Sequence, residues 1–173
     1  MKGVIANALA EMVKEKFGKE KWDDILQKSG FPKGTMFLPT QDINDNDVLK
    51  IINILCKELN ISLQQAFDAF GEYWACSFAP KLYAPFYNQA KSAKDFLLKM
   101  DKVHVLTTKS MPGAKPPRFK YEWKDDKTLI MTYESPRRLI DLVASLVKGV
   151  GKYFKENLNV RKISPDKVEI VFK

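Results

Sequence analysis

The sequence is poor in the residues on which most metal and redox sites depend. Its 173 residues include two cysteines, Cys56 and Cys76, and a single histidine, His104. The cysteines do not form a Cys-x-x-Cys pair, so the sequence gives no support for a disulfide framework, a zinc site or covalent attachment of a c-type haem. We expect both cysteines to be small core residues.

Long apolar runs are also missing from the chain. No stretch approaches the roughly 20 consecutive apolar residues that span a bilayer. The amphipathic segment after Met1 lacks the long apolar run of a signal peptide. We therefore expect a cytoplasmic protein. With 45% hydrophobic and 29% charged residues, the chain suits one globular domain with a sizeable core.

Acidic residues are outnumbered, and 29 Lys and Arg against 21 Asp and Glu give a net charge of +8. Such a balance can indicate nucleic-acid binding. Here, however, the lysines are spread along the chain among acids, and no run of five or more basic residues occurs. We therefore expect no nucleic-acid partner, while an acidic partner protein remains an open alternative.

The first half of the chain carries apolar residues at helical spacing. This spacing predicts helices over residues 4–17 and around 22–26, after 44–47, from 62 toward 78, and from about 92. Ser62 and Gln65 fit a capping box at one helix start. The run Asn44-Asp45-Asn46-Asp47 could cap a helix or bind calcium. Capping is the better interpretation, because the run lacks the glycine and the terminal glutamate of an EF-hand.

The second half changes to a period of two after a proline pair. Aromatic and charged residues alternate over 119–123, and a turn leads into a second strand over 128–133. A long helix from Pro136 follows, which its two glycines weaken without ending it. Two further strands are predicted at 158–163 and 167–172. Helices followed by a meander of about four antiparallel strands predict an α+β fold.

The only histidine lies on an apolar helix face. At 3.6 residues per turn, Ala93, Leu97, Met100 and His104 share one stripe, so the imidazole points where core side chains point. A lone histidine in such a place is more often a core residue than a ligand. Its interpretation therefore depends on the other polar groups of the site.

A group of possible anion ligands follows the predicted hairpin. Tyr133, Ser135 and Arg137 stand at alternate positions. Individually they could be a strand-end tyrosine, a helix cap and a surface arginine. Ser135 before Pro136 is typical of a helix start, with serine as N-cap and proline at the first helical position. The pattern predicts three donors near the positive end of a helix, which suits a carboxylate or a phosphate.

Together, the histidine and the Tyr-x-Ser-x-Arg motif resemble the haem-nitric oxide/oxygen binding (H-NOX) family, in its bacterial nitric-oxide-sensing type. The segments 1–3, 101–104 and 113–118 also fall in family order and at family-like spacing. The resemblance implies that His104 is the axial ligand of haem b (protoporphyrin IX iron). Its other ring nitrogen would be held by a backbone carbonyl or water. The resemblance further implies propionate contacts from Tyr133, Ser135 and Arg137, and porphyrin packing by Met100 and Pro117.

The resemblance also implies one haem domain over residues 1–173. A distal helical subdomain, about 1–63, would pack over a proximal α+β subdomain, about 64–173. The proximal subdomain would hold an antiparallel sheet of about four strands with flanking helices. The haem would be buried between the two subdomains.

The distal side of the haem decides which gas is bound. Oxygen-binding members of the family donate a hydrogen bond from a tyrosine, and the register from Tyr133 puts Leu142 at that position. Without this donor we expect nitric oxide, with carbon monoxide as a further ligand, to be bound in preference to oxygen. Family position implies a distal wall of Ile5, Phe78, Leu142 and Leu146. Trp74 is either wall or donor. The alternative function is an oxygen sensor that uses Trp74 or Tyr73 as the donor.

The expected role is sensing without catalysis. The resemblance implies that nitric oxide weakens the bond between iron and His104, which releases the histidine helix and relaxes the porphyrin held against Pro117. The signal would pass to a histidine kinase, a cyclic-di-nucleotide enzyme or a chemotaxis receptor. The sequence shows no serine–histidine or cysteine–histidine pair and no phosphate-binding glycine loop, so we expect no enzyme activity. A haem-dependent enzyme and a haem-free interaction domain are the remaining alternatives.

Overall fold

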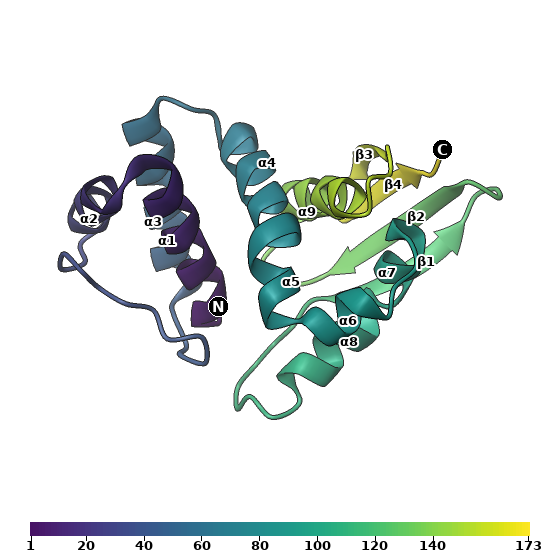
Figure 1. Cartoon of the computed structure of the whole chain (residues 1–173), viewed down its shortest axis with the longest axis horizontal. Coiled ribbons are helices and arrows are strands. Elements are labelled where there is room, and N and C mark those ends of the chain that lie inside the picture. Colours follow the sequence, from purple (N-terminus) through teal and green to yellow (C-terminus); the bar gives the residue numbers. More distant parts are fainter. The chain divides into compact units, whose positions relative to one another are not determined.

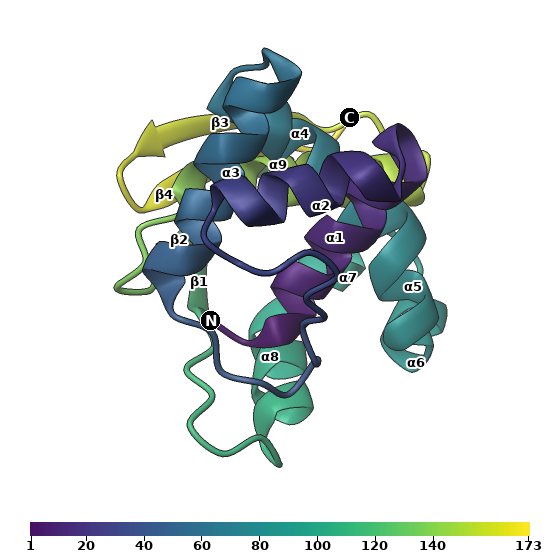
Figure 2. The ribbon, with the colours of Figure 1, turned by 90° about the vertical axis from the view of Figure 1, so that its left-hand side faces the viewer.

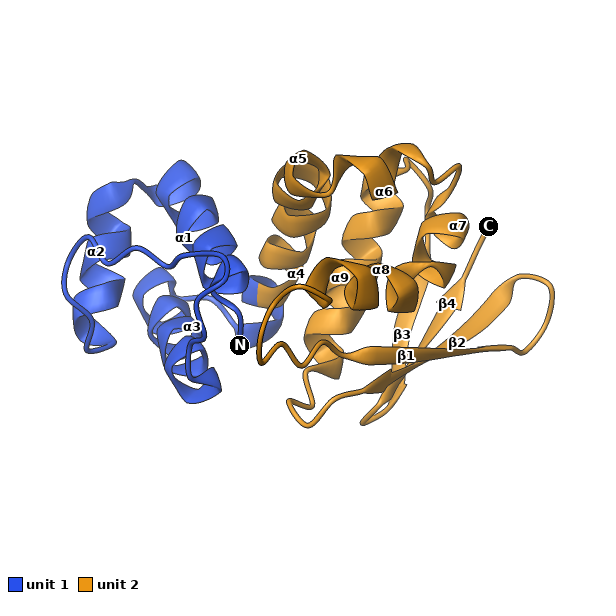
Figure 3. Ribbon diagram, turned by 90° about the horizontal axis from the view of Figure 1, so that it is seen from below, with its two compact units in different colours: residues 1–66 blue, residues 67–173 orange.

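The computed structural model describes all 173 residues and divides into two compact units, Met1–Ala66 and Phe67–Lys173. Figure 3 colours the first unit blue and the second orange. The division falls inside helix α4 (Leu63–Tyr73). The predicted subdomain boundary, near residue 63, lies in the first turn of the same helix. None of the helices has the length and apolar character that a membrane span needs.

The first unit consists of the helices α1 (Gly3–Phe17), α2 (Lys19–Lys28) and α3 (Asp45–Leu59), with a long irregular connection before α3 (Figure 2). Gly18 separates α1 from α2 at a φ of 85°, a conformation that glycine adopts readily. The Asn44 side chain accepts a hydrogen bond of 2.9 Å from the Asn46 backbone and caps α3. The capping interpretation of residues 44–47 is therefore confirmed.

Helix α4, which contains the division between the units, opens a helical rod of changing winding. A capping box starts α4, because Ser62 N donates to Gln65 Oε1 at 2.8 Å and Gln65 N donates to Ser62 Oγ at 3.2 Å. The rod continues as a π-helical turn, η1 (Trp74–Phe78), and as α5 (Ala79–Leu82). Single π turns inside helices often mark functional positions. The short helix α6 (Ala84–Asn88) follows.

The histidine segment forms two helices, where we predicted one. Ser92 caps α7 (Ala93–Leu98), and α8 (Met100–Thr108) begins after a break at Lys99. An unbroken helix would join the Asp101 N–H to the Leu97 carbonyl. The Tyr121 hydroxyl lies between these groups: it accepts from Asp101 N at 3.3 Å and donates to Leu97 O at 2.8 Å. An inserted side chain of this kind is a recognised cause of helix breaks.

Four antiparallel strands complete the unit: β1 (Arg118–Trp123), β2 (Thr128–Glu134), β3 (Asn159–Ser164) and β4 (Lys167–Val171). In Figure 1, β1 and β2 lie side by side as a hairpin. The order in the sheet is β1-β2-β4-β3, so the predicted meander is wrong in its order. The β3–β4 hairpin returns β4 alongside β2, where Leu129 pairs with Ile170 and Met131 with Val168. All four side chains are buried and belong to the core of the unit.

Helix α9 (Ile140–Tyr153) begins four residues later than predicted. Residues 135–138 form a turn in which Arg138 N donates to Ser135 O at 3.3 Å. Arg138 has a φ of 53°, which is incompatible with a continuing right-handed helix. Ser135 therefore does not cap α9. The prediction that the glycines at 149 and 151 do not end the helix is confirmed.

The glycines of α9 have a packing role at the crossing with α4. A Cβ atom added to Gly149 would lie 2.3 Å from the Gly71 carbonyl oxygen, and one added to Gly71 would lie 2.5 Å from the Ser145 backbone. The two helix backbones therefore touch, which only residues without a side chain allow. This contact fixes how α9 faces the core of the second unit.

Candidate functional site

A cavity of about 770 Å³, counting its opening to solvent, lies within the second unit. Ligand sites typically have mainly apolar walls with a few polar groups. Residues of η1, α5–α9, β1 and β2 line this cavity, and nearly all of them are aliphatic or aromatic. Among the predicted site residues the lining includes Trp74, Met100, His104 and Leu146. The cavity therefore has the character of a cofactor or ligand pocket.

His104 is the one ionisable nitrogen base in this wall. Its Nδ1 is fully buried and has no hydrogen-bond partner within the chain, and the expected hold on the second ring nitrogen by a carbonyl or water stays a prediction. The Phe119 ring lies 5.4 Å from the imidazole, stacked at 30°. Burial lowers the pKa of His104 to about 4, and the Asp101 carboxylate opposes this shift only in part. The imidazole is thus neutral at pH 7, the form that binds metals.

No group of three or more His, Cys, Asp or Glu side chains is placed to hold a metal ion. A bare metal ion usually takes most of its ligands from the protein. One buried imidazole with an unpaired nitrogen, beside an apolar cavity, instead suits a metal whose other ligands come from a cofactor. Haem has this requirement, because its porphyrin supplies four nitrogens and the protein supplies an axial base. The residues present therefore fit haem.

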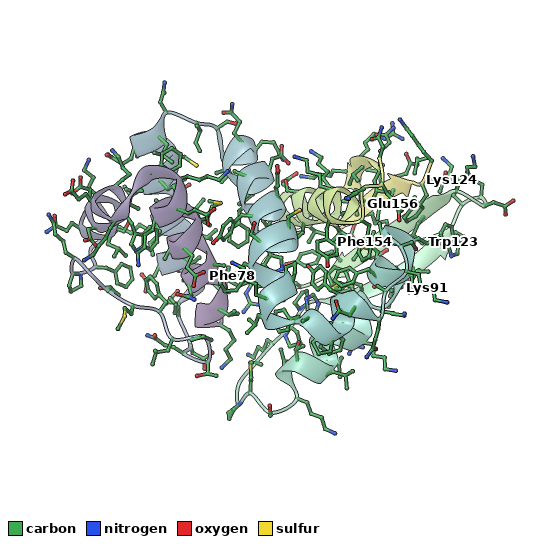
Figure 4. The ribbon with its side chains drawn as sticks, viewed as in Figure 1. Phe78, Lys91, Trp123, Lys124, Phe154 and Glu156 are labelled. Carbon is green, nitrogen blue, oxygen red and sulfur yellow. The ribbon has the colours of Figure 1, made fainter.

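Only some of the residues predicted to form the distal wall line this cavity. Trp74 lines the cavity and belongs to an aromatic stack, with ring centroids 5.4 Å from Phe78 and 5.9 Å from Phe70. Phe78 itself does not line the cavity, and Figure 4 labels it beside the helical rod and away from the strands. Leu142 is half-buried on α9 outside the lining. Buried Tyr73 also lies outside it.

Ile5 lies in the first unit, half-buried on α1. Its role in a distal wall stays a prediction.

Several lining residues were missed by the sequence analysis. Val143, Val147 and Val150 share one face of α9 with Leu146, and their spacing of three to four residues could have identified them. Phe119 was predicted to lie in a strand, but not beside the imidazole. The aromatic residues around α6 gave no usable signal, because prolines interrupt their periodicity. This group comprises Tyr83, Phe86 and Tyr87.

Residues of the Tyr-x-Ser-x-Arg motif lie at the end of β2 and in the turn after it. Tyr133 is buried, with its ring 5.9 Å from that of Phe119. Ser135 Oγ accepts a hydrogen bond from Arg137 N at 3.3 Å, and Arg137 Nη1 donates to Lys115 O at 2.9 Å. Arg137 therefore meets the loop before β1. Because α9 begins only at Ile140, the prediction that a helix starts at Ser135 and Pro136 is wrong, while anion binding by these three residues stays a prediction.

Pro117 occupies the last position before β1. It is half-buried and is not part of the cavity lining. The Arg137 guanidinium binds the carbonyl two residues earlier in the same loop. The structure thus joins the loop of Pro117 to the Tyr-x-Ser-x-Arg motif, while porphyrin packing by Pro117 stays a prediction.

Comparison with known proteins places this geometry in a family. A family model described as Haem-NO-binding matches residues 2–162. Soluble guanylate cyclase gcy-35 of Caenorhabditis elegans is 25% identical over 98% of this chain, which covers 25% of the worm protein. The chain thus spans about a quarter of the curated relative's length.

Solved structures show the same fold. A crystal structure of an oxygen-binding H-NOX domain related to soluble guanylate cyclases, in its oxygen complex, has a TM-score of 0.86 at 25% identity and covers 100% of this chain and 95% of that chain. A structure concerned with the molecular mechanism of H-NOX activation has a TM-score of 0.89 at 25% identity, over 100% and 97% of the two chains. The α+β prediction is thereby confirmed. With its family match over nearly the whole length, the chain belongs to the Haem-NO-binding (H-NOX) family of haem-binding gas-sensor domains, as its motifs predicted.

Proposed function

We propose that this chain senses nitric oxide at a ferrous haem b, with carbon monoxide as a further ligand, and passes the signal to another protein or domain. The observation that carries the proposal is the buried, neutral imidazole of His104. Its Nδ1 has no partner in the chain, and the residue lines an apolar cavity. The family match supports haem as the cofactor.

Haem, when bound, would supply the iron that binds the gas, and the chain would supply one nitrogen to hold that iron. His104 provides that nitrogen and needs no deprotonation at neutral pH, because its pKa is about 4. We assign Met100, which lines the cavity one helical turn before His104, to packing against the porphyrin. We assign the same role to Pro117.

We assign binding of the haem carboxylates to Tyr133, Ser135 and Arg137. Arg137 dominates, because a hydrogen bond between two charged groups is roughly twice as strong as one between neutral groups. The guanidinium already holds the loop before β1 through the Lys115 carbonyl. A propionate on Arg137 would therefore also order that loop.

The composition of the wall favours nitric oxide over oxygen. Bound oxygen gains from a hydrogen-bond donor, worth roughly 1.5–3 kcal/mol to a charged acceptor, or about tenfold to a hundredfold or more in affinity. We assign Ile5, Phe78, Leu142 and Leu146 to an apolar distal wall, in which the family tyrosine is replaced by Leu142. Oxygen sensing is the second candidate, because the Trp74 indole lines the cavity. Tyr73 is the other proposed donor; like Phe78 and Leu142, it lies outside the lining of this cavity.

Signal output follows from the placement of His104 on a short separate helix. Loss of the hold on the imidazole would allow the part of α8 after its first turn to shift, and a partner could detect this change. Similarity to part of a soluble guanylate cyclase supports coupling to a separate signalling module, such as a histidine kinase, a cyclic-di-nucleotide enzyme or a chemotaxis receptor. We also propose a cytoplasmic location, which the word soluble in the name of that relative supports.

Visible spectra of the reduced protein test the choice of gas. We expect a haem spectrum that does not change in air within the time of mixing and changes fully with stoichiometric nitric oxide. A stable spectral change in air that Trp74→Phe abolishes would establish oxygen sensing instead. Tyr83→Phe is the matched control, because Tyr83 also lines the cavity and its ring lies 6.5 Å from that of Trp74. A colourless protein after haem reconstitution would reject both candidates.

A further inference from the structure

The junction between α7 and α8 is built by side chains from a distant strand. Lys99, between the two helices, has φ −90° and ψ −7°, and its N–H donates to the Phe96 carbonyl three residues back at 3.1 Å. No glycine or proline lies at this point. The break therefore does not come from local backbone preference, and its cause has to be tertiary.

That cause is the hydroxyl of Tyr121 on β1. It donates to Leu97 O at 2.8 Å and accepts from Asp101 N at 3.3 Å, so it replaces the backbone bond that would join these two groups in one continuous helix. Burial raises the pKa of Tyr121 to about 12, so the hydroxyl keeps its proton and remains a donor. One phenol oxygen thus holds the two helices as separate elements.

The Asp101 carboxylate anchors the first turn of α8 to the same strand. Arg118 donates from Nε and Nη2 to its two oxygens, both at 2.7 Å, and Phe119 N donates to Oδ1 at 2.9 Å. Beyond this turn, the polar side chains of Thr107 and Thr108 donate only to carbonyls of α8 itself. Helix α8 is therefore held by hydrogen bonds at one end and by packing along the rest.

These anchors lie one helical turn from the imidazole. Asp101 and His104 are three residues apart, so they share one side of α8. Phe119 contacts both: its backbone N–H binds the Asp101 carboxylate, and its ring stacks on the His104 ring at 5.4 Å. Figure 1 shows α7 and α8 beside the β1–β2 hairpin that supplies these groups. A shift at the junction is therefore passed directly to the imidazole.

We propose that Tyr121 is a positioning residue for His104, and that its inserted hydroxyl forms a hinge between α7 and α8 about which the histidine helix turns. The proposal rests on the proposed function, because it concerns how the haem ligand is presented. Asp101 and Arg118 fix the pivot of this hinge on β1. Tyr121 makes no hydrogen bond to His104, and it acts on the imidazole through the position of α8.

Removal of the hydroxyl is expected to close the hinge. In Tyr121→Phe, Asp101 N and Leu97 O lose their shared partner, and leaving such partly buried groups unpaired is costly. A direct bond between them satisfies both groups and merges α7 and α8 into one helix. This movement draws the first turn of α8 toward α7 and changes the direction in which His104 presents its ring.

The test uses the full chain loaded with haem and reduced. We expect Tyr121→Phe to shift the iron–imidazole stretching band in the resonance Raman spectrum and to raise the rate of haem loss to a scavenger globin by roughly fivefold to tenfold. In the haem-free chain, the Asp101 amide should exchange more slowly, because a helical bond replaces the 3.3 Å bond to the phenol. Tyr153→Phe is the control, since Tyr153 makes ring contacts in the same unit but does not line the cavity.

The proposal is overturned if Tyr121→Phe has the same iron–imidazole stretching band and the same rate of haem loss as the wild type and Tyr153→Phe. Should Tyr121→Phe not fold, Asp101→Asn decides it, because loss of the pivot must also shift the band. An unshifted band in that variant counts against the hinge. If the wild type itself shows no iron–imidazole band, the proposed role of His104 fails, and amide exchange in the haem-free chain still decides the hinge.

Discussion

Replacement of Gly149 by alanine sets two effects of opposite sign against each other. Alanine in a helix interior is favoured over glycine by about 1 kcal/mol, so helix propensity alone predicts a more stable protein. The added methyl, however, would lie 2.3 Å from the Gly71 carbonyl oxygen and 2.8 Å from its carbon. Backbone atoms cannot rotate away as a side chain can. Helix α9 therefore has to retreat from α4 by roughly 1 Å, and overpacking of this kind costs about 1–3 kcal/mol.

The overpacking cost less the gain in helix propensity leaves a net loss, so we expect Gly149→Ala to lower the free energy of unfolding by up to about 2 kcal/mol. Urea denaturation of the haem-free chain, followed by circular dichroism, measures this change. Gly151→Ala is the matched control on the same helix: its added Cβ would lie 2.9 Å from the Leu158 side chain and 3.0 Å from the Glu156 carbonyl oxygen, both farther than the 2.3 Å at Gly149, so its loss should be smaller. A Gly149→Ala variant that is more stable than the wild type would refute the close crossing of α4 and α9.

Three further predictions concern charge and ligand binding. The Arg118 guanidinium lowers the pKa of Asp101 to about 2 from an ordinary value of 3.8. The ionised Asp101 carboxylate therefore stabilises the folded chain above pH 4, and this contribution is lost as the pH falls through 2. Asp101→Asn should therefore lower stability at pH 7 by roughly 1 kcal/mol and have little effect at pH 2, as measured by urea titration at both pH values. Leu142→Tyr is expected to raise oxygen affinity by about tenfold or more, and an unchanged oxygen titration would show that this residue does not face the gas. Arg137→Ala should speed haem loss to a scavenger globin by roughly tenfold, whereas Arg161→Ala, which only breaks the pair with Glu169, should not.

Local sequence signals predicted two helix starts and the fold class. The Asn44 cap and the Ser62–Gln65 capping box act over two or three residues, so the sequence alone reveals them. The alternation in β1 correctly predicted a strand, and the structure adds that its Phe119 faces the imidazole. These features depend on neighbours in the chain and not on distant parts of it.

Features set by distant contacts could not be predicted in this way. The break at Lys99 depends on Tyr121, more than 20 residues further along the chain. The strand order depends on the long-range pairing of β2 with β4. The serine–proline signal at 135–136 suggested a helix start, but the left-handed Arg138 postpones the helix to Ile140. In the first two cases a long-range contact decided the outcome, and in the third the backbone conformation of Arg138 outweighed the serine–proline signal.

The haem content of His104→Gly tests the central assignment most directly. The variant removes the imidazole and leaves a gap that free imidazole can fill. We expect the purified variant to contain little haem when it is expressed without imidazole, and to recover both haem and the wild-type ferrous spectrum when imidazole is added. Normal haem content without imidazole would contradict the assignment of His104 as the axial ligand.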